Sequence, residues 1–83
     1  MTNHPNRNWR KRWTVDLSTC SATHAPTGVI INYTRDDDGW EGKCQDLALV
    51  NRLLSDKEIN ADQLARIMRE AGDVYKEALD ARQ

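Results

Sequence analysis

The chain has no phenylalanine, only two prolines and two cysteines, and no long apolar run among its 83 residues. Without phenylalanine, the core must be built from tryptophan, tyrosine and aliphatic side chains, which are sufficient for a small core. No segment approaches the roughly 18 apolar residues of a membrane span. The first residues contain neither an apolar run nor a small-residue cleavage pattern, so no export signal is indicated. We therefore expect a cytoplasmic location, with Cys20 and Cys44 as reduced thiols.

The chain also lacks a large excess of either positive or negative charge, because its net charge is only −1. There is thus no overall attraction to nucleic acid or to an anionic membrane surface. The distribution is uneven, however. Residues 1–35 carry five basic side chains against one acidic (+4), whereas residues 36–83 carry seven basic against twelve acidic (−5). This polarity favours contacts between oppositely charged surfaces.

The length allows one domain and excludes two. With 39% hydrophobic and 30% charged residues, the composition is that of a folded protein. Residues 1–9 show no periodicity, and we expect them to form a flexible N-terminal arm. The single domain then covers residues 10–83.

Three segments have the pattern of β-strands. Residues 12–18 alternate apolar and polar side chains, and residues 29–34 are rich in β-branched and aromatic side chains. The small, polar segment 19–28 between them reads as a loop, because it contains both a proline and a glycine. A turn at residues 35–39 leads to a third short strand at 40–43, which predicts an antiparallel meander.

The alternation also predicts which side chains share the buried face of this sheet. They are Trp13, Val15, Leu17, Val29, Ile31 and Tyr33. Ile30 falls on the opposite face.

Helical spacing begins after Cys44. Asp46 is a suitable N-cap for a short helix at 47–54, although the alternation of its first leucines leaves a strand open there. Asn60 and Gln63 form a capping-box pattern at the start of a helix of about twenty residues. The predicted fold is therefore α+β: a three-stranded antiparallel β-meander followed by a short and a long C-terminal helix, in the order βββαα.

The most basic segment is a candidate binding site, composed of Arg7, Trp9, Arg10, Lys11 and Arg12. Its cations could neutralise phosphates while the tryptophan stacks on a base. The same residues could instead contact an acidic protein surface or shield a sheet edge. Because the rest of the chain is acidic, we favour a protein contact over nucleic acid.

The long helix carries an apolar stripe made of Leu64, Ile67, Met68, Val74, Tyr75 and Leu79. Such a stripe can pack in the core of one chain or bind a second copy. The helix is about twice as long as a sheet of short strands can cover, so a homodimer is as well supported as a monomer.

Catalysis and metal binding have little support. Cys20, His24 and Cys44 match no standard zinc spacing, and nothing orients either thiol as a nucleophile. Asp36, Asp37 and Asp38 precede a glycine, as in a solvated turn rather than a calcium loop. We therefore expect neither an enzyme nor a bound metal or cofactor.

The sequence alone does not determine the function. The favoured hypothesis is a noncatalytic protein-interaction module that binds a protein partner or itself, with no membrane contact. The alternative is a nucleic-acid-binding protein that uses the basic N-terminal segment.

Overall fold

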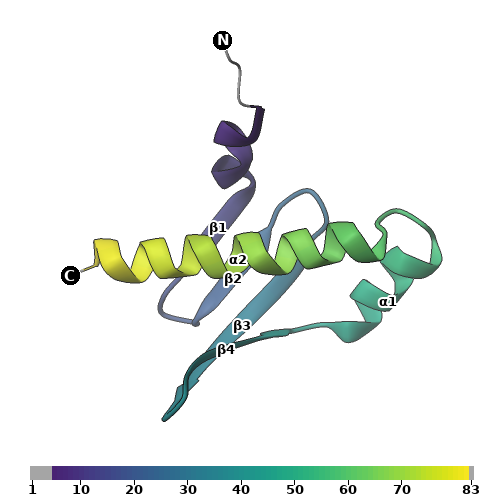
Figure 1. The fold of residues 1–83 in the computed structure, drawn as a ribbon. Coiled ribbons are helices and arrows are strands. Elements are labelled where there is room, and N and C mark those ends of the chain that lie inside the picture. Colours follow the sequence, from purple (N-terminus) through teal and green to yellow (C-terminus); the bar gives the residue numbers. More distant parts are fainter. Residues whose placement is uncertain (1–4, 83) are drawn as a thin grey trace.

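The computed structural model describes residues 5–82 (Figure 1). Its elements, in chain order, are the 3-10 helix η1 (Pro5–Arg12), strands β1 (Trp13–Asp16), β2 (Ser21–His24), β3 (Val29–Asp36) and β4 (Gly39–Cys44), and helices α1 (Leu47–Ser55) and α2 (Ala61–Ala81). Each strand pairs with the next in an antiparallel sheet of order β1-β2-β3-β4. The predicted α+β class and meander are confirmed.

The predicted number of strands was wrong by one, because the expected loop at residues 19–28 contains β2. Its short side chains gave no periodic signal. Ala22 is fully buried where α2 packs on β2, so only a small side chain fits at this position. The composition that resembled a loop is thus a consequence of close packing.

The predicted buried face is confirmed by the register. Val15 pairs with Ala22, and Ala22 pairs with Ile31, so these side chains form one row beneath α2. Strand β1 is shorter than the predicted strand at residues 12–18. It ends at Asp16, whose carboxylate accepts hydrogen bonds from the backbone N–H and the hydroxyl of Ser18 at 2.9 and 2.6 Å.

The two helices begin where their caps predict. The N–H of Gln63 donates to the side chain of Asn60, and the N–H of Asn60 donates to the side chain of Gln63, both at 2.8 Å. Asp46 accepts a hydrogen bond from the N–H of Leu49 at 3.1 Å. Residues 47–54, for which the sequence left a strand open, are therefore helical. Within the described residues, neither helix has the length and apolarity needed to cross a membrane.

Regular structure begins before the expected position near Arg10, because η1 starts at Pro5. Residues 1–4 of the predicted flexible arm lie outside the described residues. Flexibility of the arm therefore stays a prediction.

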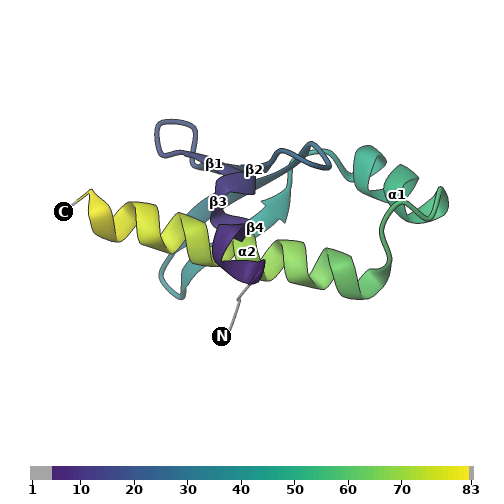
Figure 2. The same ribbon diagram turned by 90° about the horizontal axis from the view of Figure 1, so that it is seen from above.

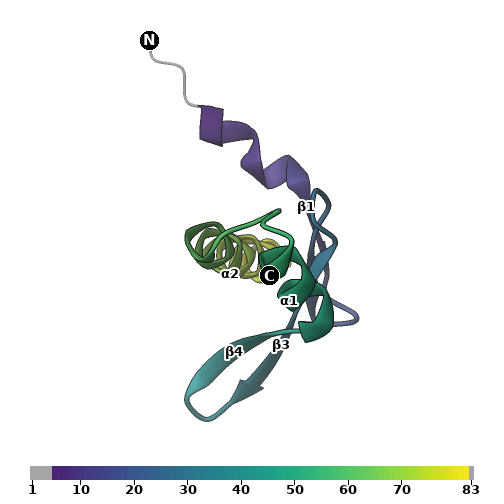
Figure 3. The same cartoon turned by 90° about the vertical axis from the view of Figure 1, so that its right-hand side faces the viewer.

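The molecule has two layers. Figure 3 shows α2 on one face of the sheet, while the other face is uncovered. Figure 2 shows α1 beyond the end of the sheet, near the start of α2. Helix α2 packs mainly on β1 and β2, so the β3–β4 hairpin extends beyond its cover. The core comprises Trp13, Ala22, Val29, Ile31, Tyr33, Val50, Leu53, Ile59, Ile67, Ala71, Val74 and Tyr75.

Gly42 allows the ring of Tyr33 to lie across β4. A Cβ atom at this position would lie 2.6 Å from Cε1 of Tyr33 and 3.1 Å from Cγ2 of Ile31. We expect Gly42→Ala to lower the free energy of unfolding by about 1–3 kcal/mol, because a packed ring must move. Urea denaturation would measure this change.

Gly72→Ala is the matched control, because its Cβ would come no closer than 3.9 Å to Tyr33. An alanine inside α2 should stabilise the fold by up to about 1 kcal/mol. Equal effects of the two substitutions would contradict the packing described here.

Candidate functional site

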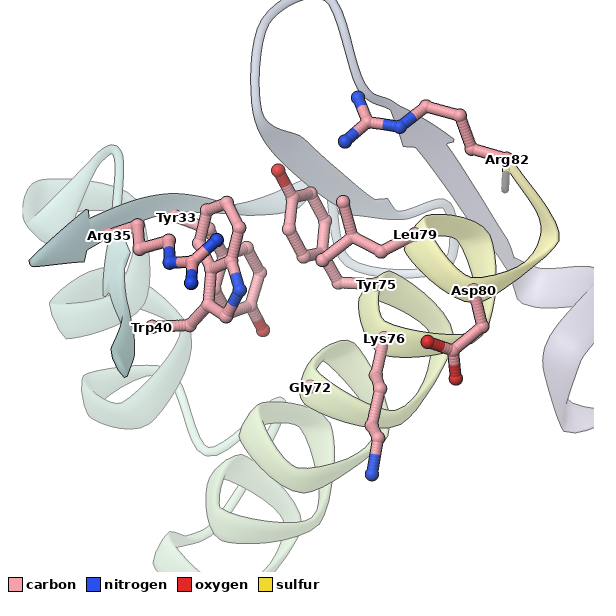
Figure 4. Close-up of a pocket in the computed structure, with 9 residues that line it drawn as sticks. All are labelled: Tyr33, Arg35, Trp40, Gly72, Tyr75, Lys76, Leu79, Asp80 and Arg82. Atoms are coloured by element: carbon pink, nitrogen blue, oxygen red, sulfur yellow. The ribbon is translucent and has the colours of Figure 1, made fainter. Parts of the chain in front are cut away.

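A pocket of about 460 Å³ lies between the β3–β4 hairpin and the C-terminal half of α2 (Figure 4). This volume falls in the range of sites that bind small molecules or single side chains. The pocket is lined by Tyr33, Arg35, Trp40, Gly72, Tyr75, Lys76, Leu79, Asp80 and Arg82.

Three aromatic rings form the wall of the pocket. Tyr33 and Tyr75 are stacked, with centroids 4.3 Å apart and planes at 18°. Trp40 meets Tyr75 edge-on at 5.5 Å, yet 45% of its surface is exposed. Tyr75, which is buried in the core and stacked on Tyr33, therefore supports Trp40 from one side and leaves the rest of its surface to solvent. An exposed, supported tryptophan is an apolar contact surface.

The charged groups around this wall are mostly basic. Arg35 and Trp40 face each other across the strands, and the guanidinium lies 5.9 Å from the centre of the indole. Lys76 and Arg82 supply two further cations, against the single carboxylate of Asp80. The pocket therefore favours a group with negative charge.

The two tyrosines stay neutral at physiological pH. Burial, followed by the neighbouring Tyr75 and Asp73, raises the pKa of Tyr33 to about 12. Burial is also the main cause that raises the pKa of Tyr75, followed by the adjoining Cys20 thiol. Both phenols thus contribute packing and hydrogen-bonding capacity rather than a base.

The basic N-terminal segment contacts the chain itself. Arg10 binds Glu77 through three hydrogen bonds of 2.8 to 3.1 Å, and its guanidinium lies 4.6 Å from the Trp9 ring. This pairing lowers the pKa of Glu77 through its hydrogen bonds to Arg10. Lys11 and Arg12 are exposed, whereas the side chain of Arg7 lies outside the described part of the chain. Two of the five predicted binding residues are therefore engaged with each other and with α2.

The cysteines and His24 do not converge. Cys20 lies in the β1–β2 turn, Cys44 contacts Met68 through sulfur atoms 3.8 Å apart, and both thiols are free. His24 bonds Thr27 at 2.8 Å through Nδ1. In residues 5–82, no three His, Cys, Asp or Glu side chains are grouped as metal ligands would be.

The apolar stripe of α2 packs on the chain's own sheet. Ile67, Val74 and Tyr75 are buried, and Leu64, Met68 and Leu79 are partly buried against the same core. Self-association through this stripe stays a prediction, and only its partly buried members have surface left to offer.

The pocket was missed at the level of sequence because its residues had structural interpretations. The sequence predicts Tyr33 in the core, Arg35 in a turn and Trp40 in a strand. One signal was available: pairing strands across the acidic turn places Arg35 opposite Trp40. The contribution of α2, whose pocket residues begin about thirty residues after Trp40, has no counterpart in local sequence.

His24 makes stability depend on pH. It is 7% exposed, and burial is the main cause that lowers its pKa from 6.5, with Arg12 adding to this effect and Glu70 opposing it. The unfolded chain therefore binds a proton more readily than the folded one, so stability falls as pH drops through the unfolded pKa.

We expect the free energy of unfolding to decrease between about pH 7.5 and pH 5.5, with a slope below about 1.4 kcal/mol per pH unit. His24→Gln should abolish most of this slope whatever its effect on stability at neutral pH. Chemical denaturation of both proteins at several pH values measures it. An unchanged slope in the variant would show that another group is responsible.

Comparison with known proteins provides no relative for this geometry. No family model, no curated protein and no solved structure matches the chain. The function is therefore inferred from the residues around the pocket.

Proposed function

We propose that the protein is a small noncatalytic interaction module that binds a protein partner through the pocket between the β3–β4 hairpin and α2. The occupant is an aromatic side chain of the partner with a carboxylate beside it. The observation that carries this proposal is Trp40, an exposed indole supported by buried tyrosines and flanked by cations.

The aromatic wall supports an aromatic occupant. A ring inserted beside Trp40 would cover the exposed part of the indole and contact Leu79. Buried tryptophan and tyrosine pairs are frequent among the residues that dominate binding energy at protein interfaces. The rings are already held in place, so little side-chain entropy is lost on binding.

The cations support an acidic occupant. Arg35 on β3 and Lys76 on α2 both line the pocket, so a carboxylate bound there would be attracted to both cations. A ligand with the phosphates of nucleic acid would instead bring several negative charges near Asp80 and near the acidic hairpin turn, Asp36 to Asp38. This placement favours a peptide with a few acidic groups over a polyanion.

The lining also favours binding over catalysis. Its residues include no serine, cysteine or histidine that could act as nucleophile or base. The phenols of Tyr33 and Tyr75 are held neutral by burial, so neither supplies a base. We place this module in the cytoplasm, since Cys20 and Cys44 are free thiols of the kind that reducing compartments maintain.

Capped tripeptides test the proposal. Acetylated, amidated Glu-Phe-Glu should shift the NMR signals of the Trp40 indole N–H and of the Gly72 backbone N–H in nitrogen-labelled protein. The dissociation constant should be about 1 mM or lower. Glu-Ala-Glu and Lys-Phe-Lys should bind about tenfold more weakly, because each lacks one of the two recognised groups.

Charge reversal in the pocket supplies the matched test. Arg35→Glu combined with Lys76→Glu should weaken Glu-Phe-Glu binding about tenfold or more. Arg52→Glu combined with Arg69→Glu changes the net charge equally at exposed positions outside the lining, and should leave binding unchanged. Equal losses in both variants, or no binding of any tripeptide, would refute the proposal. Binding of single-stranded oligothymidylate that only the pocket variant loses would replace the protein partner with nucleic acid.

A further inference from the structure

The outer edge of β4 carries unpaired backbone groups. The N–H of Gln45 bonds the carbonyl of Ile30, and hydrogen-bonded pairs alternate along an antiparallel ladder. The pairs of β4 with β3 at Glu41 and Lys43 are therefore the bonded ones. The N–H and C=O groups of Trp40, Gly42 and Cys44 consequently point away from the sheet.

In the part of the chain that the structure describes, no strand pairs with this edge of β4. Helix α2 packs mainly on β1 and β2, and β4 is the edge of the sheet opposite β1, as Figure 3 also shows. The strand has six residues and no proline, and its exposed charges are one of each sign. The opposite edge, β1, is only four residues long and follows directly from η1. Open edges without blocking features are prone to pair with another strand.

The sequence of β4 is complementary to itself. If two copies pair antiparallel about a two-fold axis at Gly42, Trp40 lies opposite Cys44 of the other copy, and Glu41 lies opposite Lys43 of the other copy. The outward-pointing residues then form the hydrogen-bonded pairs, as the ladder requires, which gives about six backbone hydrogen bonds. No other register centred within β4 both places Glu41 opposite Lys43 and makes the outward-pointing residues the hydrogen-bonded pairs.

Charge and packing support this register. Each Glu41 meets a Lys43 at a non-hydrogen-bonded position, where cross-strand side chains are closest, and this favourable pair occurs twice. Within the single chain the two side chains form only a long ion pair of 4.0 Å and stay exposed, at 59% for Glu41 and 75% for Lys43, so each can pair with a second copy instead. On the other face, the exposed surface of Trp40 gains Cys44 of the second copy as a neighbour.

We propose that two copies of the protein associate through β4, joining their sheets into one antiparallel sheet of eight strands. The contact is limited to β4, because beyond it Asp38 of one copy would approach Asp46 of the other. The pairing uses other charged groups than the pocket does, because Glu41 and Lys43 lie on the opposite face of the sheet from Arg35 and Trp40.

Charge exchange along β4 tests the pairing. Sedimentation equilibrium or light scattering from about 10 µM to about 1 mM covers the range in which a small edge interface dissociates. Glu41→Lys and Lys43→Glu each place like charges opposite one another twice, and each should raise the dissociation constant about tenfold or more. The double variant restores opposite charges and should return to within about threefold of the natural chain.

Amide exchange locates the contact independently. With increasing concentration, the amides of Trp40, Gly42 and Cys44 should become more protected, while those of Glu41 and Lys43 should change little because β3 already binds them. A protein that stays monomeric at about 1 mM would refute the proposal. A dimer that ignores both charge reversals but dissociates in Leu79→Glu would assign the contact to α2 instead. The charge variants of β4 keep every residue of the pocket lining, so their monomers should still bind Glu-Phe-Glu, and failure of one proposal leaves the other standing.

Discussion

The packing of α2 on β1 and β2 is the interaction on which the rest of this structure depends. A helix can approach a sheet closely only where both surfaces carry small side chains, and Ala22 and Ala71 are both fully buried. Seating the helix there covers one half of the sheet and leaves the hairpin projecting. The stack of Tyr33 on Tyr75 then joins the projecting half to the helix, and Gly42 makes room for that stack.

The polarity of charge along the chain is partly resolved within the molecule. The basic segment of η1 reaches the acidic side of α2, where Arg10 and Glu77 pair and Trp9 lies against the same guanidinium. Trp13 adds a second link from the N-terminal half, since its indole N–H donates to Glu70 at 3.0 Å. From the sequence alone, the basic N-terminal segment indicated an external acidic partner. In the structure, Arg10 instead binds an acidic side chain of the same chain.

The fold was largely predictable because its signals are local. Alternation in β3, the caps at Asp46 and Asn60 and the acidic turn each involve residues within a few positions of one another. Strand β2 was not predictable in this way, because Ser21 to His24 adopt a strand through pairing on both sides rather than through their own preferences. The pocket was hidden for a related reason: its two walls are separated by about thirty residues of chain, and each residue alone has an ordinary structural role.

The hairpin that α2 leaves uncovered explains why the candidate binding features share one region. On its inner face, Trp40 packs edge-on against Tyr75 of α2 yet stays 45% exposed. At its outer edge, within residues 5–82, the same strand has no partner strand for the N–H and C=O groups of every second residue. A longer or more central helix would have removed both features together, by burying the indole and by shielding the edge. In a chain with so small a core, this uncovered part of the sheet is where contact with another molecule can add buried surface without disturbing the packing already made.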